Sequence, residues 1–161
     1  MNRTRTSIDD LHDLGQSVWL DDLRREMLES GELRQRIAAG HLRGMTSNPT
    51  IFEQGIGRSE IYTADLRPLA QAGWSADRIL DALIADDIRQ AADLFRPVYE
   101  ETQGGDGFVS LEVHPALADE TEATLEEVRR LWTLLNRPNV MIKIPATAAG
   151  IPAVRQAISE G

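Results

Sequence analysis

The chain contains no cysteine. Disulfide frameworks and thiolate metal sites are therefore excluded, and the composition fits a reducing compartment, for which the cytoplasm is the default expectation. Long apolar runs are also missing. No stretch approaches the roughly 18 uncharged apolar residues of a membrane span, and the first seven residues contain no apolar core of a secretory signal. We therefore expect a protein that is neither exported nor embedded in a membrane by a signal of its own.

Positive charge is scarce. The sequence has 17 Lys and Arg residues against 26 Asp and Glu residues, which gives a net charge of -9. Nucleic acids and anionic membranes attract clustered positive charge, so this balance disfavours both as partners and favours a small-molecule substrate. Only one of the basic residues is lysine, Lys143. Any chemistry that needs a primary side-chain amine therefore falls to that residue.

The length of 161 residues and a hydrophobic content of 42% suit one core of ordinary size. No change in composition separates two halves of the chain. We therefore expect residues 1–161 to form a single domain.

Short β-branched or apolar runs bounded by polar residues or glycine predict buried strands. There are four such runs, at residues 17–21, 42–48, 108–113 and 140–145. Helical periodicity lies between them. It predicts helices over residues 22–37 with a break at Ser30 and Gly31, from Ser75 to about Gly104, from Asp119 to Asn136, after Thr147, and between Ser59 and Ala70. In these helices Arg25 and Asp87 are interpreted as exposed surface residues.

Strands and helices that alternate strictly indicate βαβ units and a parallel α/β sheet. Two architectures share this pattern: a (β/α)8 barrel of the TIM type, which needs roughly 250 residues, and a doubly wound open sheet. Four units would make about half of the barrel.

Side chains alternate between the two faces of a strand, so sequence parity predicts which residues share a face. One polar or ionisable side chain near the C-terminal end of each predicted strand falls on a common face: Asp21, Asn48, Glu112 and Lys143. Parallel α/β folds place their chemistry at this end of the sheet. We therefore expect these side chains to meet.

Lys143 stands within an apolar strand, where burial favours the neutral amine. A neutral amine can attack a carbonyl and form an imine, and Glu112 and Asp21 are the nearby candidates for the proton transfers. The alternative for an isolated strand lysine is a buried ion pair or a side chain that reaches solvent. The four convergent strand ends favour the chemical role. A metal site at Glu112 and His114 is disfavoured, because no second histidine has ligand spacing.

Four motifs of the chain resemble those of transaldolases, in the same order and at similar spacing. They are residues 17–21 (SVWLD), residues 46–52 (TSNPTIF), residues 110–113 (SLEV) and residues 142–147 (IKIPAT). The resemblance covers essentially the whole chain, and the second and fourth motifs together are specific.

The resemblance implies a (β/α)8 barrel that moves a dihydroxyacetone unit from sedoheptulose 7-phosphate to glyceraldehyde 3-phosphate in the pentose phosphate pathway, without a metal or an organic cofactor. By position, Lys143 would form a Schiff base, and Glu112 would act through a water. Asp21 would handle the proton of the hydroxyl beside the cleaved bond, although a slip of one residue would exchange it with Asp22. The substrate-binding residues implied are Asn48, Thr46 and Thr147.

The chain is shorter than the resemblance requires, because motifs of strands five to eight have no counterpart before Gly161. We therefore expect a half barrel from the N-terminal part of such an enzyme, inactive or nearly so alone. A half barrel exposes two sheet edges, so we also expect it to self-associate or to pack loosely. The alternatives are a fructose 6-phosphate aldolase and a non-catalytic half barrel that binds a partner.

Overall fold

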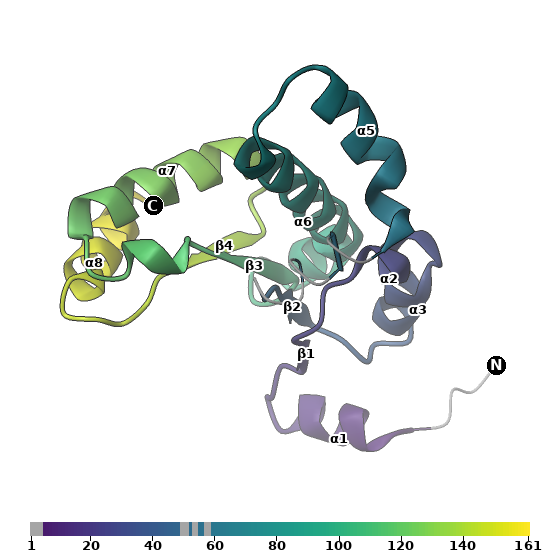
Figure 1. The fold of residues 1–161 in the computed structure, drawn as a ribbon. Helices are drawn as coiled ribbons and strands as arrows, with labels where there is room; N and C mark the ends of the chain where they lie inside the picture. The colour runs from purple at the N-terminus through teal and green to yellow at the C-terminus, as the bar shows by residue number, and fades with distance from the viewer. Residues whose placement is uncertain (1–4, 49–51, 53–54, 57–58) are drawn as a thin grey trace.

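The chain folds into a parallel sheet covered by helices (Figure 1). The computed structural model describes residues 5–48, 52, 55–56 and 59–161. Its four strands are β1 (Trp19–Leu20), β2 (Gly44–Thr46), β3 (Phe108–Glu112) and β4 (Val140–Lys143). They lie in the order β1-β2-β3-β4, and each neighbouring pair is parallel. The predicted α/β class and the positions of the four strands are confirmed, although the strands are shorter than the apolar runs.

The helices fill the intervals between the strands. They are α1 (Ser7–Asp13), α2 (Arg25–Glu29), α3 (Glu32–Ala38), the 3-10 helix η1 (Glu60–Tyr62), α5 (Thr63–Gln71), α6 (Ala76–Glu101), the 3-10 helix η2 (Pro115–Leu117), α7 (Thr121–Leu135) and α8 (Gly150–Glu160). The sequence predicted all of them except α1 and η2. In Figure 1, α1 lies at one end of the molecule, apart from the sheet and the helices that cover it.

Local signals in the sequence set the helix ends. The Ser75 side chain accepts a hydrogen bond of 3.4 Å from the Arg78 amide and caps α6, as serine does at many helix starts. Gly31, with a φ of 76°, separates α2 from α3 because glycine enters this left-handed region at low cost. Asn136 ends α7 in the same region, with a φ of 45°. These three boundaries are the ones that the sequence predicted.

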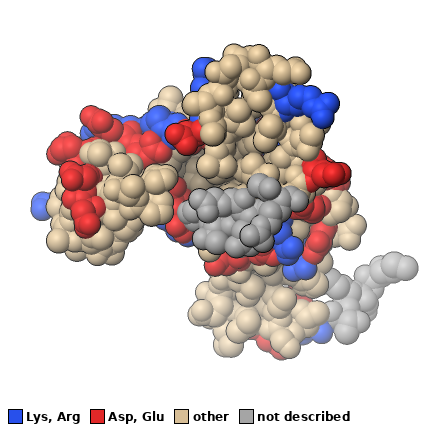
Figure 2. All heavy atoms as spheres, viewed as in Figure 1, with Lys and Arg blue, Asp and Glu red and all other residues tan. Residues whose placement is uncertain are grey.

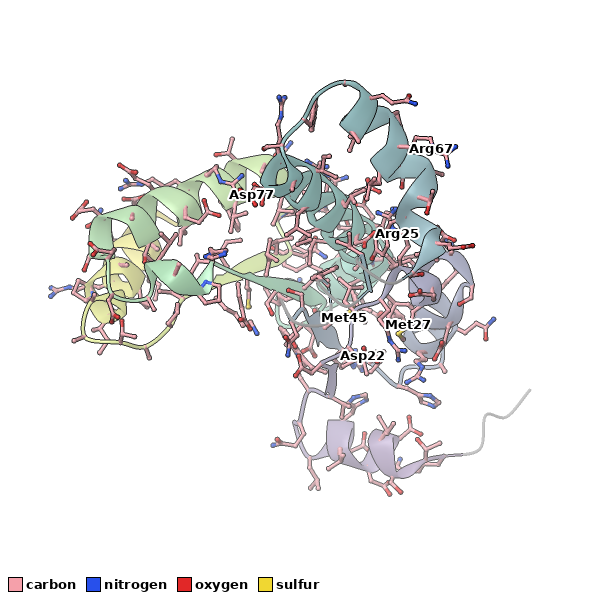
Figure 3. The ribbon with its side chains drawn as sticks, viewed as in Figure 1. Asp22, Arg25, Met27, Met45, Arg67 and Asp77 are labelled. Carbon is pink, nitrogen blue, oxygen red and sulfur yellow. The ribbon has the colours of Figure 1, made fainter. Side chains whose placement is uncertain are left out.

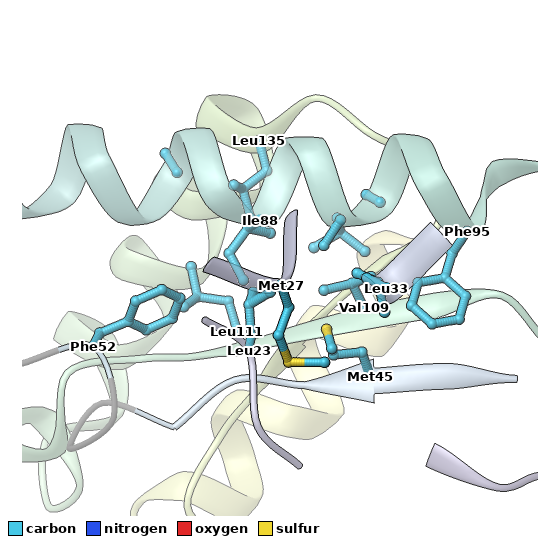
Figure 4. Packing of buried hydrophobic residues seen from close by; sticks show 14 of the residues in the cluster. Leu23, Met27, Leu33, Met45, Phe52, Ile88, Phe95, Val109, Leu111 and Leu135 are labelled. Atoms are coloured by element: carbon cyan, nitrogen blue, oxygen red, sulfur yellow. The ribbon is translucent and has the colours of Figure 1, made fainter. Parts of the chain in front are cut away.

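One face of the sheet forms the core. Met45 of β2, Val109 of β3 and Val140 of β4 are partners in adjacent strands, and all three are buried. Helix α6 crosses this face and packs Ile88 and Phe95 against it (Figure 4). At roughly 25 cal/mol per Å² of apolar surface, this burial is the main stabilisation of the sheet. The predicted alternation of side chains between the two faces is confirmed, since Thr46, Ser110 and Lys143 lie on the opposite face.

The opposite face of the sheet is partly open. Met141 of β4 is 42% exposed there, next to Ser110 of β3 in the register. Near β1 the same face is closed by the Trp19 ring, which lies over Gly44 of β2. A four-stranded parallel sheet with helices on one side and an open second side is consistent with part of a TIM-type barrel.

The prediction that Arg25 and Asp87 are exposed is wrong. Arg25 is 3% exposed and Asp87 is fully buried, and the Arg25 Nε donates a hydrogen bond of 2.7 Å to Asp87. The Tyr62 hydroxyl donates to the other Asp87 oxygen, at 2.7 Å, and Asp65 forms a further ion pair with Arg25. Burial raises the pKa of Asp87, although Tyr62 and Arg25 act in the opposite direction.

Helical periodicity could have revealed Asp87. It lies four residues after Leu83 and four before Ala91, so it falls on the apolar stripe of α6. Burial lowers the pKa of Arg25, but Asp87, Asp65 and Tyr62 together raise it and the net direction is upward. Figure 3 shows Arg25 between α2 and the helices α5 and α6.

Surface charges of opposite sign are interspersed. On the face shown in Figure 2, acidic side chains gather over α7 and α8, with arginines among them. Arg129 pairs with Glu160 across these two helices, and Arg130 pairs with Glu127 within α7 at 2.7 Å. No helix among the described residues is long and apolar enough to span a membrane.

Candidate active site

Lys143 and Glu112 form the centre of the candidate site. They are partners in the register of β3 and β4, at the C-terminal ends of both strands, and their side chains form an ion pair. The Lys143 side chain is 38% exposed and that of Glu112 is 34% exposed. The burial expected for Lys143 is therefore incomplete, and the amine is held beside a carboxylate at a surface that solvent reaches.

The amine of Lys143 also contacts the end of β2. Its Nζ donates a hydrogen bond of 3.5 Å to the backbone oxygen of Ser47. Asn48 is the next residue, and its backbone oxygen accepts from the Phe52 amide at 3.2 Å. The end of β2 therefore lies within reach of Lys143. Pro49, Thr50 and Ile51 of the same motif lie outside the described residues.

A second pair of predicted residues joins β1 and β2. The Thr46 hydroxyl donates a hydrogen bond to the Asp21 carboxylate, just beyond the end of β1. Asp22 pairs with Arg24 instead, and Figure 3 labels it near the start of α2. Of the two adjacent aspartates, the one bonded to the neighbouring strand is therefore Asp21, as strand parity predicted.

The hydroxyl of Thr147 is occupied by the backbone. It donates to the Ala118 oxygen, in the segment between η2 and α7, and it accepts from the Gly150 amide at 2.9 Å. A hydroxyl has a single proton to donate, and in this structure that proton is bonded to the backbone. The structure places Thr147 between two loops of the site instead of directing its proton toward the Lys143 amine.

A buried hydroxyl that sequence reasoning did not single out lies beside the pair. Ser110 is 2% exposed, shares a sheet face with Glu112, and its Oγ has no hydrogen-bond partner among the described residues. Glu112 also borders a cavity of about 370 Å³ between α6 and α7, whose walls include Ile84 and Leu131. A water molecule occupies about 30 Å³ of liquid volume, so several fit in this space.

A metal centre finds no support in the described part of the chain. No group of three or more His, Asp or Glu residues is placed there to hold an ion. The His114 Nδ1 accepts a hydrogen bond of 3.2 Å from the Ala116 amide, so that nitrogen serves to cap η2.

Two features therefore define the kind of site. The first is an amine paired with a carboxylate at the C-terminal end of a parallel sheet. The second is the carboxylate of Asp21, which follows β1 and accepts a hydrogen bond from Thr46 of β2. Amine nucleophiles with adjacent acids are typical of enzymes that form imines with carbonyl substrates.

Comparison with known proteins identifies the family of the chain. The family model described as Transaldolase/Fructose-6-phosphate aldolase matches residues 18–161. A transaldolase of Thermobifida fusca is 52% identical over 151 residues, which cover 94% of this chain and 41% of the relative. One of Trichodesmium erythraeum is 49% identical over 152 residues, with 94% and 40% covered. Transaldolase 1 of Streptomyces avermitilis is 47% identical over 161 residues, with 100% and 43% covered.

The chain therefore belongs to the transaldolase/fructose-6-phosphate aldolase family. It spans about two fifths of the length of these curated relatives. The family that the four motifs predicted is thus confirmed.

Proposed function

We propose that this chain carries the Schiff-base centre of a transaldolase. The reaction moves a dihydroxyacetone unit from sedoheptulose 7-phosphate to glyceraldehyde 3-phosphate and yields erythrose 4-phosphate and fructose 6-phosphate. The observation that carries the proposal is the pair of Lys143 and Glu112 on adjacent parallel strands. The chain's sole lysine thereby has its own acid and base beside it.

In the first step Lys143 loses a proton to Glu112 and its Nζ attacks the ketone carbon of the donor. The nitrogen then gives up a second proton, and Glu112, acting through a water, delivers both protons to the former carbonyl oxygen, which leaves as water and gives the protonated imine. The partial exposure of the Glu112 side chain, 34%, supports this role, because water can reach the carboxylate.

The carbon–carbon bond then breaks with the imine as the electron sink. Asp21 takes the proton of the hydroxyl next to that bond, and the aldose phosphate leaves. The remaining three-carbon enamine attacks the aldehyde of the acceptor, and Asp21 returns the proton to the new hydroxyl. Water finally hydrolyses the imine and frees Lys143. The bond from Thr46 supports this role, since it orients the Asp21 carboxylate.

Thr46 and Asn48 are proposed to bind the hydroxyls of the donor, since both lie at the end of β2, near Ser47 and the Lys143 amine. The pentose phosphate pathway, the cytoplasm and independence of metals belong to the same proposal. Residues 1–161 alone are expected to turn over little or no substrate, because the relatives carry about three fifths of their length beyond the match.

A second candidate function is the direct cleavage of fructose 6-phosphate. The description of the matching family names both activities, and both would use the same lysine. The two are separated by the acceptor: a transaldolase transfers the three-carbon unit to an aldose phosphate, whereas an aldolase releases free dihydroxyacetone.

The proposed function is tested with a chimera. Residues 1–161 are joined to the C-terminal part of the Thermobifida fusca relative that the match leaves uncovered. Borohydride in the presence of fructose 6-phosphate should add the reduced three-carbon unit to Lys143, located by peptide mass mapping. Turnover should fall by about 10⁴-fold or more in Lys143→Ala.

The variant Lys143→Arg is the matched control, because it keeps the positive charge and removes the neutral amine. It should be as inactive as Lys143→Ala. An undiminished adduct in either variant would refute the assignment of Lys143.

A further inference from the structure

We propose that Thr147 and Thr121 are positioning residues, which together hold the Glu112–Lys143 pair by locking the two loops that follow β3 and β4. This inference rests on the proposed function for its catalytic meaning. It gives Thr147 a positioning role beside the substrate-binding role that the resemblance implies.

The two threonines form reciprocal bonds between the loops. The Thr147 hydroxyl, after β4, donates to the Ala118 oxygen after β3. The Thr121 hydroxyl, at the start of α7, donates to the Ala149 oxygen at the start of α8, at 2.7 Å. Each loop therefore supplies one donor and one acceptor to the other, and both bonds oppose a shift of one loop relative to the other.

The locked segments begin at the catalytic pair. Glu112 is the last residue of β3 and Lys143 the last of β4, and the Val113 amide donates to the Lys143 oxygen at 3.1 Å. Beyond this point, the described hydrogen bonds that join the two loops directly are those of Thr147 and Thr121. A shift of either loop would move one partner of an ion pair that is held at close range.

Gly150 allows a close turn in the loop that carries Thr147. Its amide donates to the Thr147 hydroxyl, and a Cβ at this position would lie 1.9 Å from the Pro145 oxygen. The turn after Lys143 therefore packs too closely for any larger residue. The bond from the Gly150 amide therefore orients the Thr147 hydroxyl within its own loop.

The test uses the single lysine of the chain. Acetylation of Lys143 by a water-soluble succinimidyl ester is followed by mass spectrometry at pH 8, with the terminal amine of the same chain as internal reference. The Glu112 carboxylate holds the Lys143 Nζ in an ion pair, so the amine reacts more slowly with the reagent while this contact is intact. In Glu112→Gln the rate should rise about fivefold or more, and in Thr147→Val and Thr121→Val it should rise at least about threefold.

Two variants separate positioning from a general loss of structure. Thr147→Ser retains the hydroxyl and should react at the wild-type rate. Thr124→Val removes a bond of equal length, 2.7 Å from its hydroxyl to the Leu117 oxygen, which stays within the loop after β3. It should also react at the wild-type rate, because it does not join the two loops.

Wild-type rates in both Thr147→Val and Thr121→Val would overturn the proposal, as would an equal acceleration in Thr124→Val. An unchanged rate in Glu112→Gln would overturn it too. If Thr147→Val fails to fold, Thr121→Val tests the other bond of the lock.

Because acetylation needs no turnover, a chimera that forms no sugar adduct would refute the proposed function and leave this result intact. In an active chimera, Thr147→Val should lower kcat with little change in KM, and Thr147→Ser should restore it.

Discussion

Gly44 shows at the scale of one residue how the sheet accommodates the candidate site. It pairs with Trp19 in the register of β1 and β2, and the indole ring covers it on the face that carries Asp21 and Thr46. A Cβ at position 44 would lie 2.4 Å from the ring. The Trp19 ring can lie over β2 on this face because Gly44 has no side chain to block it.

We expect Gly44→Ala to destabilise the chain by about 1–3 kcal/mol, because the added methyl group overfills the space under the ring. Denaturant unfolding followed by far-UV circular dichroism measures the change. In a Trp19→Leu background the same substitution should cost less. Equal costs in the two backgrounds would mean that the ring does not limit position 44.

The buried cluster around Arg25 joins three helices and the 3-10 helix η1. Arg25 of α2 bonds to Asp87 of α6 and pairs with Asp65 of α5, and its guanidinium lies 4.2 Å from the centre of the Tyr62 ring in η1. The cluster therefore fastens the segment after β1 to those after β2. These segments follow the strand ends that bear Asp21 and Asn48.

We expect Arg25→Ala to destabilise the chain by about 3–5 kcal/mol, since it leaves the buried carboxylate of Asp87 without its partner. Arg24→Ala is the matched control. Arg24 pairs with Asp22 at the surface, where its side chain is 57% exposed, and its loss should cost less than about 1 kcal/mol. Equilibrium denaturation measures both. Similar costs would show that burial does not strengthen the Arg25 cluster.

At the scale of the whole molecule, the sheet has one covered and one open face. β1 and β4 are its edge strands, and Met141 is partly exposed on the face that carries Lys143. Unpaired strand edges and exposed apolar side chains favour pairing with a second chain. We propose that residues 1–161 self-associate through this side of the molecule.

Sedimentation velocity over a range of concentrations tests this proposal. We expect Met141→Glu to shift the midpoint of association to about tenfold higher concentration, since it removes part of the apolar contact area. Ile158→Glu is the control, because Ile158 is 75% exposed on α8, away from the sheet. A monomer at all concentrations, or an equal effect of both variants, would contradict the proposal.

The sequence by itself determined the alternation of strands and helices, the helix boundaries at Ser75, Gly31 and Asn136, and the side of the sheet on which each strand residue lies. These features follow from local signals, because capping, left-handed turns and the two-residue period of a strand depend on a few neighbouring residues. The four motifs also determined the family.

Only the tertiary structure decided which polar groups pair. Periodicity could place Asp87 on the apolar stripe of α6, but not identify Arg25 as its partner 62 residues earlier. The resemblance implied a substrate-binding role for Thr147, and only the fold shows that its hydroxyl donates to the Ala118 oxygen. Such pairings depend on the register between strands and on the distance between loops, and both are set by packing between segments far apart in the chain.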